Sequence, residues 1–366
     1  MKRALGCWLL AAGLVGAETV PAGQDGLLPK AATRDFPPAA HSAVERGLAW
    51  LASVQNPDGS WTCRIGHKLY NNYEGEEGKH VGVTALACMS FLASGNSPGR
   101  GPYGEVVRRG TEFLIEALRE EDGYITYDGS RMYSHAFATM YLAEAYGMVP
   151  DRRLKVALKR AVQCIINSQN PDGGWRYSPM PVDADLSVTV STLQALRGAR
   201  NAGISIPMET IERAQQYVRA CAAGGGRHGF HYQKPFGSFG DGHPDDRITF
   251  AITACGVVSM ISAGEYNAAE ERYAVDALER YRQDFQRKAY WGRYHYFYAH
   301  YYGMQAYYTL APDATWNEYR DEVVDEILRE QLGDGRWDDD VGPTYATAMA
   351  CLVMQLPCEW LPIFQK

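Results

Sequence analysis

The sequence lacks an excess of positive charge. Its 36 Lys and Arg residues stand against 43 Asp and Glu, which gives a formal net charge of −7. Nucleic-acid binding needs a basic face that neutralises phosphates, and no basic stripe is present. We therefore expect no nucleic acid among the partners.

The cysteines also lack any clustered spacing. Of the eight, Cys7 lies near the N-terminus, and an odd number remains after it. Five lie inside apolar helical segments, where a thiol behaves as a small hydrophobic group. This pattern excludes a disulfide framework, and with no local zinc motif we expect neither a metal nor another cofactor. The five are Cys88, Cys164, Cys221, Cys255 and Cys351.

No apolar run is long enough to be a clear membrane span. Lys2 and Arg3 precede an uncharged stretch from Ala4 to Ala17 that ends in small residues. This stretch is shorter than the roughly 20 residues that cross a bilayer, and it matches a signal peptide over residues 1–17. We predict export to the periplasm or cell envelope, a Pro- and Gly-rich linker over 18–40, and a folded domain over 41–366.

The folded part contains a repeated unit in which Gln stands six residues before Trp. The clear copies pair Gln55 with Trp61, Gln169 with Trp175, and Gln331 with Trp337. Trp61 and Trp175 are 114 residues apart, which corresponds to two units of about 57. In each copy we expect Trp to fill the seam between units and Gln to bond the next turn.

Each unit combines two helices of different character. One is charged on one side, as expected for a helix with a wet face, and the other carries almost no charge and needs burial on every side. Six alternating pairs predict an all-α fold: a single (α/α)6 toroid with an inner apolar ring and an outer amphipathic ring. The expected inner helices are 81–94, 136–143, 186–196, 248–264, 297–311 and 344–356.

The Gln-x5-Trp units resemble the QW repeats of the terpenoid cyclase and protein prenyltransferase superfamily, in particular the squalene-hopene cyclases. The resemblance covers His41 to about Leu356. It implies the toroid but not an activity, because one fold hosts many functions. The prenyltransferase zinc site needs an Asp-x-Cys, which this sequence lacks.

A second resemblance concerns the acid motif of class II terpene cyclases, Asp-x-Asp-Asp-Thr, whose middle Asp protonates the substrate. Asp183 and Asp185 match its first two acids, whereas Leu186 and Ser187 replace the last two residues. The resemblance implies Asp185 as the proton donor, with Asp183 as the coupled carboxylate. The alternative from the residues themselves is that Asp185 caps the following helix.

Parallel inner helices bring their N-termini to one rim of the ring, where their dipoles gather. The repeat register places His80, His135, Asp185 and His300 at similar height on this rim. We expect these histidines to bind the ligand. The alternatives are a zinc site made with Asp185, and ordinary polar residues at helix starts.

Further binding residues are expected from the aromatic segment 290–302 and from one cation. Tyr298 and Tyr301 would line the cavity, and Arg247 would meet an anionic group. The partner is then a small isoprenoid-like molecule or a glycan held in the central cavity, and association with a membrane surface fits either.

The sequence is compatible with three functions. The first is acid-initiated cyclisation of an isoprenoid by a squalene or terpenoid cyclase-like protein. The second is a non-catalytic binding or scaffold toroid of the cell envelope. The third is a toroid lyase or hydrolase that acts on polysaccharide.

Overall fold

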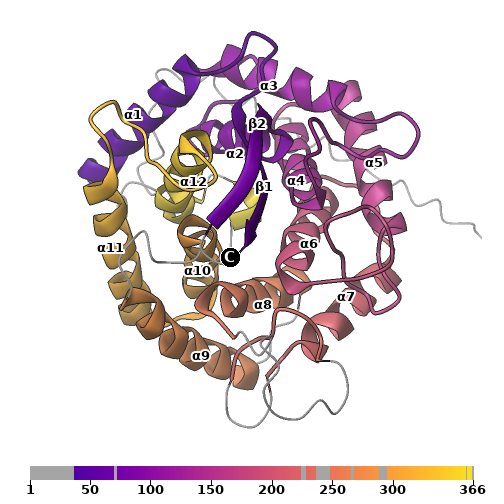
Figure 1. Cartoon of the computed structure of the whole chain (residues 1–366), viewed down its shortest axis with the longest axis vertical. Helices are drawn as coiled ribbons and strands as arrows, with labels where there is room; N and C mark the ends of the chain where they lie inside the picture. Colours follow the sequence, from indigo (N-terminus) through magenta and orange to yellow (C-terminus); the bar gives the residue numbers. More distant parts are fainter. Residues whose placement is uncertain are drawn as a thin grey trace, which may run out of the picture.

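The computed structural model describes residues 37–69, 72–223, 228–235, 248–264, 268–287, 295–359 and 361–364. The signal peptide, most of the linker and Arg247 lie outside these ranges. Within them, twelve α-helices form two concentric rings (Figure 1), and none of these helices combines the length and the apolar character needed to cross a bilayer. The predicted all-α toroid of six helix pairs is confirmed.

The inner ring is built from the charge-poor helices. In α2 every residue from Val81 to Leu92 is buried, as expected for a helix that is apolar all round. Each inner helix contacts the next, and the last contacts the first, so the ring is closed. The inner helices are α2 (Val81–Leu92), α4 (Met132–Met148), α6 (Leu186–Asn201), α8 (Phe250–Ser262), α10 (Tyr296–Leu310) and α12 (Pro343–Gln355).

The outer ring is built from the amphipathic helices. In the fifth helix Leu154, Leu158, Ala161 and Ile165 are buried at helical spacing, while the opposite face carries Arg and Lys. The outer helices are α1 (Pro38–Ser53), α3 (Gly104–Glu116), α5 (Arg152–Asn167), α7 (Met208–Ala220), α9 (Ala268–Gln286) and α11 (Asp313–Glu330).

The repeated tryptophans join the two rings. Trp61 is fully buried; its Nε1 donates to Leu51 O of α1 (2.8 Å), and its backbone N donates to Thr84 Oγ1 of α2 (3.0 Å). Trp175 and Trp337 make the same two kinds of bond. The Trp61 ring also lies against Gly110, in the outer helix of the next unit, where an added Cβ atom would come within 3.2 Å of Cζ3, so Trp fills the seam between units as predicted.

The repeated glutamines join one outer helix to another. Gln55 Nε2 donates to Gly59 O in its own turn (3.0 Å) and to Val106 O in the first turn of α3 (2.9 Å). Gln331 Nε2 donates in the same way to Gly335 O (2.8 Å) and to Ala43 O of α1 (2.9 Å), which ties the last unit to the first.

A β-hairpin was not predicted. Strands β1 (Thr62–Leu69) and β2 (Asn72–Lys79) follow Trp61 directly and pair antiparallel, with Thr62 opposite Lys79. Two hydrogen bonds hold its base: Arg64 N donates to the backbone Val341 O (3.1 Å), and Lys79 N donates to the side-chain Asp128 Oδ2 (2.9 Å). In Figure 1 the hairpin lies across one opening of the inner ring.

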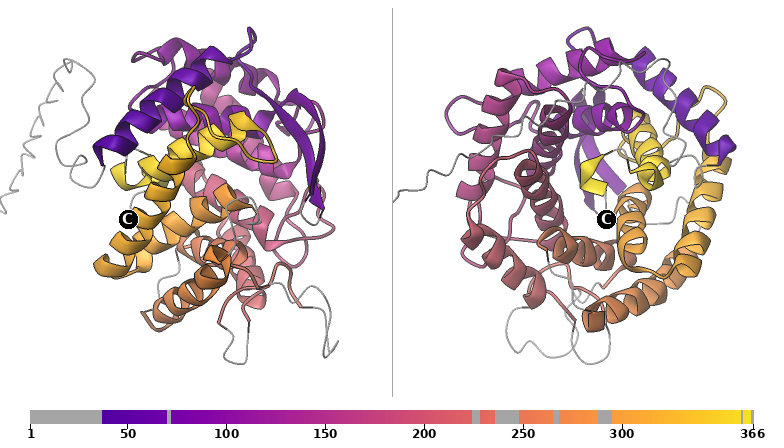
Figure 2. Two further views of the ribbon diagram at one scale, coloured as in Figure 1. Left: turned by 60° about the vertical axis from the view of Figure 1, so that its left-hand side comes forward. Right: turned by 180° about the vertical axis from the view of Figure 1, so that it is seen from behind.

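The C-terminal segment lies at the other opening (Figure 2, right). It forms two short 3₁₀ helices, η3 (Leu356–Cys358) and η4 (Pro362–Phe364). The buried Phe364 ring packs edge-on against Tyr301 of α10, with centroids 6.0 Å apart. A cavity of about 10 Å³ remains beside it, which is room for about one water molecule.

Glu144 of α4 lies near this segment and is 4% exposed. Burial raises the pKa of its carboxyl group to about 7, although a backbone hydrogen bond from Ile363 and the charge of Arg197 both lower it. A carboxyl group this far from solvent favours its neutral form. Between pH 4.5 and about 7, the Glu144 carboxyl group is therefore mostly protonated in the folded protein and mostly ionised in the unfolded chain.

We predict that Gln331→Met destabilises the ring closure. The variant leaves the Gly335 and Ala43 carbonyls without their donor, which costs about 1 to 3 kcal/mol of unfolding free energy. Urea unfolding measures this, with the exposed Gln163→Met of α5 as the control. Equal stability of both variants would contradict the role of Gln331.

We predict a pH-dependent gain in stability from Glu144→Gln. Because the folded-state pKa is raised to about 7, ionisation of Glu144 lowers wild-type stability as pH rises from 4.5 to about 7. The variant lacks this loss and should be about 3 kcal/mol more stable at pH 8, and close to wild type at pH 4. Unfolding free energies at both pH values test it; a pH-independent difference would refute it.

Candidate active site

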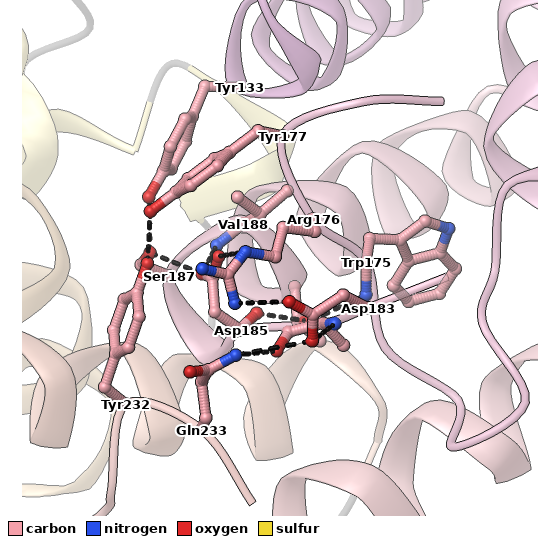
Figure 3. Close-up of polar contacts among 12 residues, drawn as sticks. Tyr133, Trp175, Arg176, Tyr177, Asp183, Asp185, Ser187, Val188, Tyr232 and Gln233 are labelled. Atoms are coloured by element: carbon pink, nitrogen blue, oxygen red, sulfur yellow. Dashed lines mark hydrogen bonds and ion pairs between the residues drawn. The ribbon is translucent and has the colours of Figure 1, made fainter. Parts of the chain in front are cut away.

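Asp185 lies at the N-terminus of α6 and is completely buried. Its backbone N donates to Trp175 O (3.0 Å), so the repeated Trp fixes its position. Its Oδ1 accepts from Val188 N (2.9 Å) and from Ser187 Oγ (2.6 Å), which is the cap arrangement expected from the sequence (Figure 3).

The two carboxylate oxygens of Asp185 differ. Oδ1 accepts two hydrogen bonds, whereas Oδ2 has no hydrogen-bond partner among the described groups. Among the described residues, Arg176 is the cation paired with Oδ2, with its Nε 3.9 Å away. A proton on Asp185 therefore belongs on Oδ2, because Oδ1 already serves as acceptor.

Burial dominates the ionisation of Asp185. Desolvation raises the pKa of its carboxyl group above the ordinary value of 3.8, and the bonds from Ser187 and Val188, the charge of Arg176 and the Tyr232 side chain only partly oppose this. The helix cap, which favours the carboxylate, and burial, which favours the neutral acid, thus act in opposite directions on the pKa of one residue.

Asp183 lies apart from this buried position. Its side chain is 55% exposed and pairs with Arg176 Nη1 through Oδ2 (2.8 Å). Its Oδ1 accepts from Ala184 N (2.7 Å). Arg176 thus lies between the two acids, and the predicted coupling of Asp183 to Asp185 stays a prediction.

Tyrosine hydroxyl groups surround the buried acid. Tyr133 of α4 hydrogen-bonds Ser187 Oγ, and Tyr298 of α10 donates to Ser187 O (2.8 Å). The Tyr133 and Tyr298 rings meet edge to face, 6.4 Å apart. Tyr298 thus lies beside the start of α6, and its predicted role in binding a ligand stays a prediction.

Two further tyrosines come from the turns that follow the repeated aromatic residues. Tyr177 stands two residues after Trp175 and Tyr232 two after Phe230, and their hydroxyl groups hydrogen-bond each other. The guanidinium groups of Arg176 and Arg131 lie 5.0 and 5.6 Å from the Tyr177 ring. Sequence analysis missed both tyrosines, although their shared repeat position was a usable signal.

His80 and His135 are held in the wall of the ring. His80 caps α2, where its Nδ1 accepts from Val83 N (3.3 Å). His135 is fully buried; its Nδ1 accepts from Ile125 N (3.0 Å) and its Nε2 contacts Ala161 O (3.1 Å). Burial lowers the pKa of His135 to about 4, so it is neutral.

The other predicted ligands lie elsewhere. His300 Nδ1 hydrogen-bonds Tyr319 of the outer helix α11 (2.8 Å), and Tyr301 packs on Phe364 near the opposite opening. In the part of the chain that the structure covers, no three His, Cys, Asp or Glu side chains form a group able to hold a metal. The structure therefore does not bring the three histidines together with Asp185.

Comparison with known proteins gives partial sequence matches. The profile of the squalene-hopene cyclase C-terminal domain matches residues 30–147. Drimenyl diphosphate synthase of Streptantibioticus cattleyicolor is 28% identical over 149 residues, which cover 39% of this chain and 24% of that enzyme. Lanosterol synthase of Aspergillus fumigatus is 26% identical over 147 residues, 37% of this chain and 17% of that enzyme. The matches thus span about a quarter or less of the curated relatives.

Solved structures share the fold over most of the chain. A type II terpene cyclase variant from Scytonema, in complex with geranylgeranyl dihydroxybenzoate, has a TM-score of 0.58 at 15% identity and covers 89% of this chain and 98% of that one. Cellobiose 2-epimerase from Spirochaeta thermophila has a TM-score of 0.64 at 14% identity, with coverages of 89% and 99%. A family 76 glycoside hydrolase from Bacteroides thetaiotaomicron has a TM-score of 0.59 at 11% identity, with coverages of 87% and 98%.

At these identities the solved structures establish the fold alone, and a fold hosts several activities. The sequence matches add that the likeness extends to terpene cyclases in particular. Together they confirm the resemblance that the Gln-x5-Trp units indicate: in part of its sequence and in its fold, this chain is similar to the terpenoid cyclase superfamily.

Proposed function

We propose that this protein catalyses acid-initiated cyclisation of an isoprenoid, with Asp185 as the proton donor. The observation that carries the proposal is the state of the Asp185 carboxyl group. It is buried, its pKa is raised, and its Oδ2 is left free by the cap that engages Oδ1. A general acid needs an environment that favours its protonated form and an oxygen that is not already engaged as an acceptor, and Oδ2 is suited to both.

The proposed step transfers the proton of Asp185 Oδ2 to one carbon of a substrate double bond. The pi electrons form the new C–H bond, the neighbouring carbon becomes a carbocation, and Asp185 is left as a carboxylate. A second double bond then attacks the cation and closes a ring, and the final cation loses a proton to water. The Arg176 guanidinium stabilises the carboxylate left on Asp185.

The tyrosine rings are suited to the cationic intermediates. Tyr133, Tyr177 and Tyr298 come from different elements and gather beside Asp185. Each ring face that meets a carbocation would contribute about 0.5 to 2 kcal/mol. This supports an isoprenoid substrate.

Leu186 stands where the class II cyclase motif has its third acid, and the structure accounts for this change. Leu186 is fully buried, with its backbone N bonded to Tyr232 O (2.8 Å), so a carboxylate there would be desolvated. Ser187 holds Asp185 Oδ1 instead. We infer that Ser187 orients the acid in this chain.

Carbohydrate chemistry is the second candidate. The epimerase and the glycoside hydrolase have similar folds, and the hydroxyl groups of Tyr133, Tyr177 and Tyr298 would also suit a glycan. Glycosidases need two carboxyl groups at the reacting bond. Here the second carboxyl group would be that of Asp183, which is exposed and already paired with Arg176. We therefore rank this candidate second.

Export to the periplasm or cell envelope is part of the proposal. It depends on residues 1–17, which lie outside the described residues. A non-catalytic scaffold in that compartment is the outcome that remains if neither an isoprenoid nor a glycan is converted.

We predict that Asp185→Asn abolishes cyclisation of squalene or a prenyl diphosphate, with a loss of at least about a thousandfold, because the amide has no acidic proton. Asp183→Asn is the matched control and should retain activity within about tenfold. Product analysis by gas chromatography and mass spectrometry measures both. Equal product from Asp185→Asn and wild type would eliminate Asp185 as the acid.

We predict that Ser187→Ala slows cyclisation about tenfold and moves the alkaline limb of the kcat profile to higher pH. The Ser187 hydrogen bond lowers the pKa of Asp185, so its loss raises that pKa and weakens the acid. Ser191→Ala, one turn further along α6, is the control. A lower rate with an unmoved pH profile would show that Ser187 is structural only.

A further inference from the structure

Residues 361–364, here called the plug, close the opening of the inner ring that lies opposite the hairpin (Figure 2, right). Leu361, Ile363 and Phe364 are buried, and Phe364 N donates to Leu361 O (2.9 Å), which makes the plug one compact turn. The Phe364 ring meets Tyr301 of α10. Tyr301 in turn meets Phe137 of α4 on the opposite side of the ring, with centroids 6.1 Å apart. The plug therefore covers the interior of the ring.

The plug is docked on a buried carboxyl group. Glu144, near the end of α4, accepts a hydrogen bond from Ile363 N. Its Oε2 has no hydrogen-bond partner among the described groups, and neither has the buried hydroxyl group of Tyr301. Buried polar atoms are normally paired. Docking thus leaves two polar groups unsatisfied that water would satisfy once the plug leaves.

The fit of the plug is also incomplete. The void of about 10 Å³ lies against Ile363 and Phe364, and its other walls include Val258 and Ile261 of α8 and Gln305 of α10. Atoms that face a void lose contacts that a close-packed interior would give them. The plug is therefore held less firmly than a fully packed segment would be.

Few charges face Glu144. Arg197 of α6 lies near it and favours its ionised form. Tyr301 of α10 faces it as a neutral phenol, because burial raises the pKa of that hydroxyl group. Helix α2 has no charged residue, the cations of α5 lie on its solvent face, and His135 of α4 is neutral. Burial outweighs Arg197, and it raises the pKa of Glu144 to about 7.

We propose that residues 361–364 form a pH-sensitive plug, which closes this opening of the inner ring while the Glu144 carboxyl group is protonated and leaves when that group ionises. Once the plug leaves, Glu144 regains water and its ordinary pKa of 4.5. Because the docked form holds the proton more tightly, docking is strongest below pH 4.5 and weakens as the pH rises through about 7. The inference does not depend on the proposed cyclisation.

Hydrogen exchange of the full chain, corrected for the intrinsic rate at each pH, tests the plug. The wild-type amides of Ile363 and Phe364 should lose at least about tenfold of their protection between pH 5 and pH 8. Glu144→Gln keeps a neutral side chain, so its protection should stay constant within about twofold. The exposed Glu116→Gln of α3 is the matched control and should behave like wild type. Helix α12 should stay protected throughout, which separates release of the plug from global unfolding.

Access to the interior can be measured with a thiol placed beneath the plug. Val258→Cys introduces it in the wall of the void, at a buried position. At pH 8, iodoacetamide should alkylate this thiol at least about tenfold more slowly when Glu144→Gln is added, and the ionisation of the thiol itself cancels because the pH is the same. The native cysteines of the described chain are all buried, and peptide mapping identifies the labelled one.

Two results would overturn the role of Glu144: wild-type protection that is equal at pH 5 and pH 8, or protection that falls equally in Glu144→Gln. Two others would overturn the plug itself. One is a loss of protection that occurs in α12 together with residues 361–364. The other is an equal rate of alkylation with and without Glu144→Gln.

Discussion

Three of the six units are joined to a neighbouring unit by a glutamine side-chain amide that donates to two backbone carbonyls. One carbonyl lies in its own turn and the other in the first turns of a neighbouring outer helix. Buried carbonyls need donors, so this amide sets how the outer helices are spaced. The Trp that follows is held against the inner helix, and in the third unit its carbonyl receives Asp185 N. The proposed catalytic acid is thus positioned by the same contact that builds the ring.

The fold was largely predictable because its two signals are local: the helix pairs recur six times and the Gln-x5-Trp unit three times. Helices with and without charge alternate along the chain, and the Gln-x5-Trp units mark their register. The hairpin over residues 62–79 was not predicted because its strands show no clear alternation of apolar and polar residues, and Glu74, Glu76 and Glu77 are all exposed. The position of the C-terminal segment depends on contacts such as Phe364 with Tyr301, which no local pattern records.

The candidate site was predictable only in part. Asp185 follows from its motif and its place before α6, but Tyr133 and Tyr298 reach it from other helices through tertiary packing. The histidines share a register in the sequence without sharing an orientation. His135 lies inside α4, which begins earlier at Met132, and His300 is turned toward α11. Equal height on a ring does not fix the direction of a side chain.

Closure of the ring through Gln331 and Ala43 also bears on how the chain folds. These residues are 288 positions apart, so the final seam is among the least local contacts in the molecule. An open solenoid can add units one after another from any starting point. A closed ring has no terminal unit with an exposed face. Its last seam can form only after the entire chain has been synthesised, and such a high contact order makes folding slow.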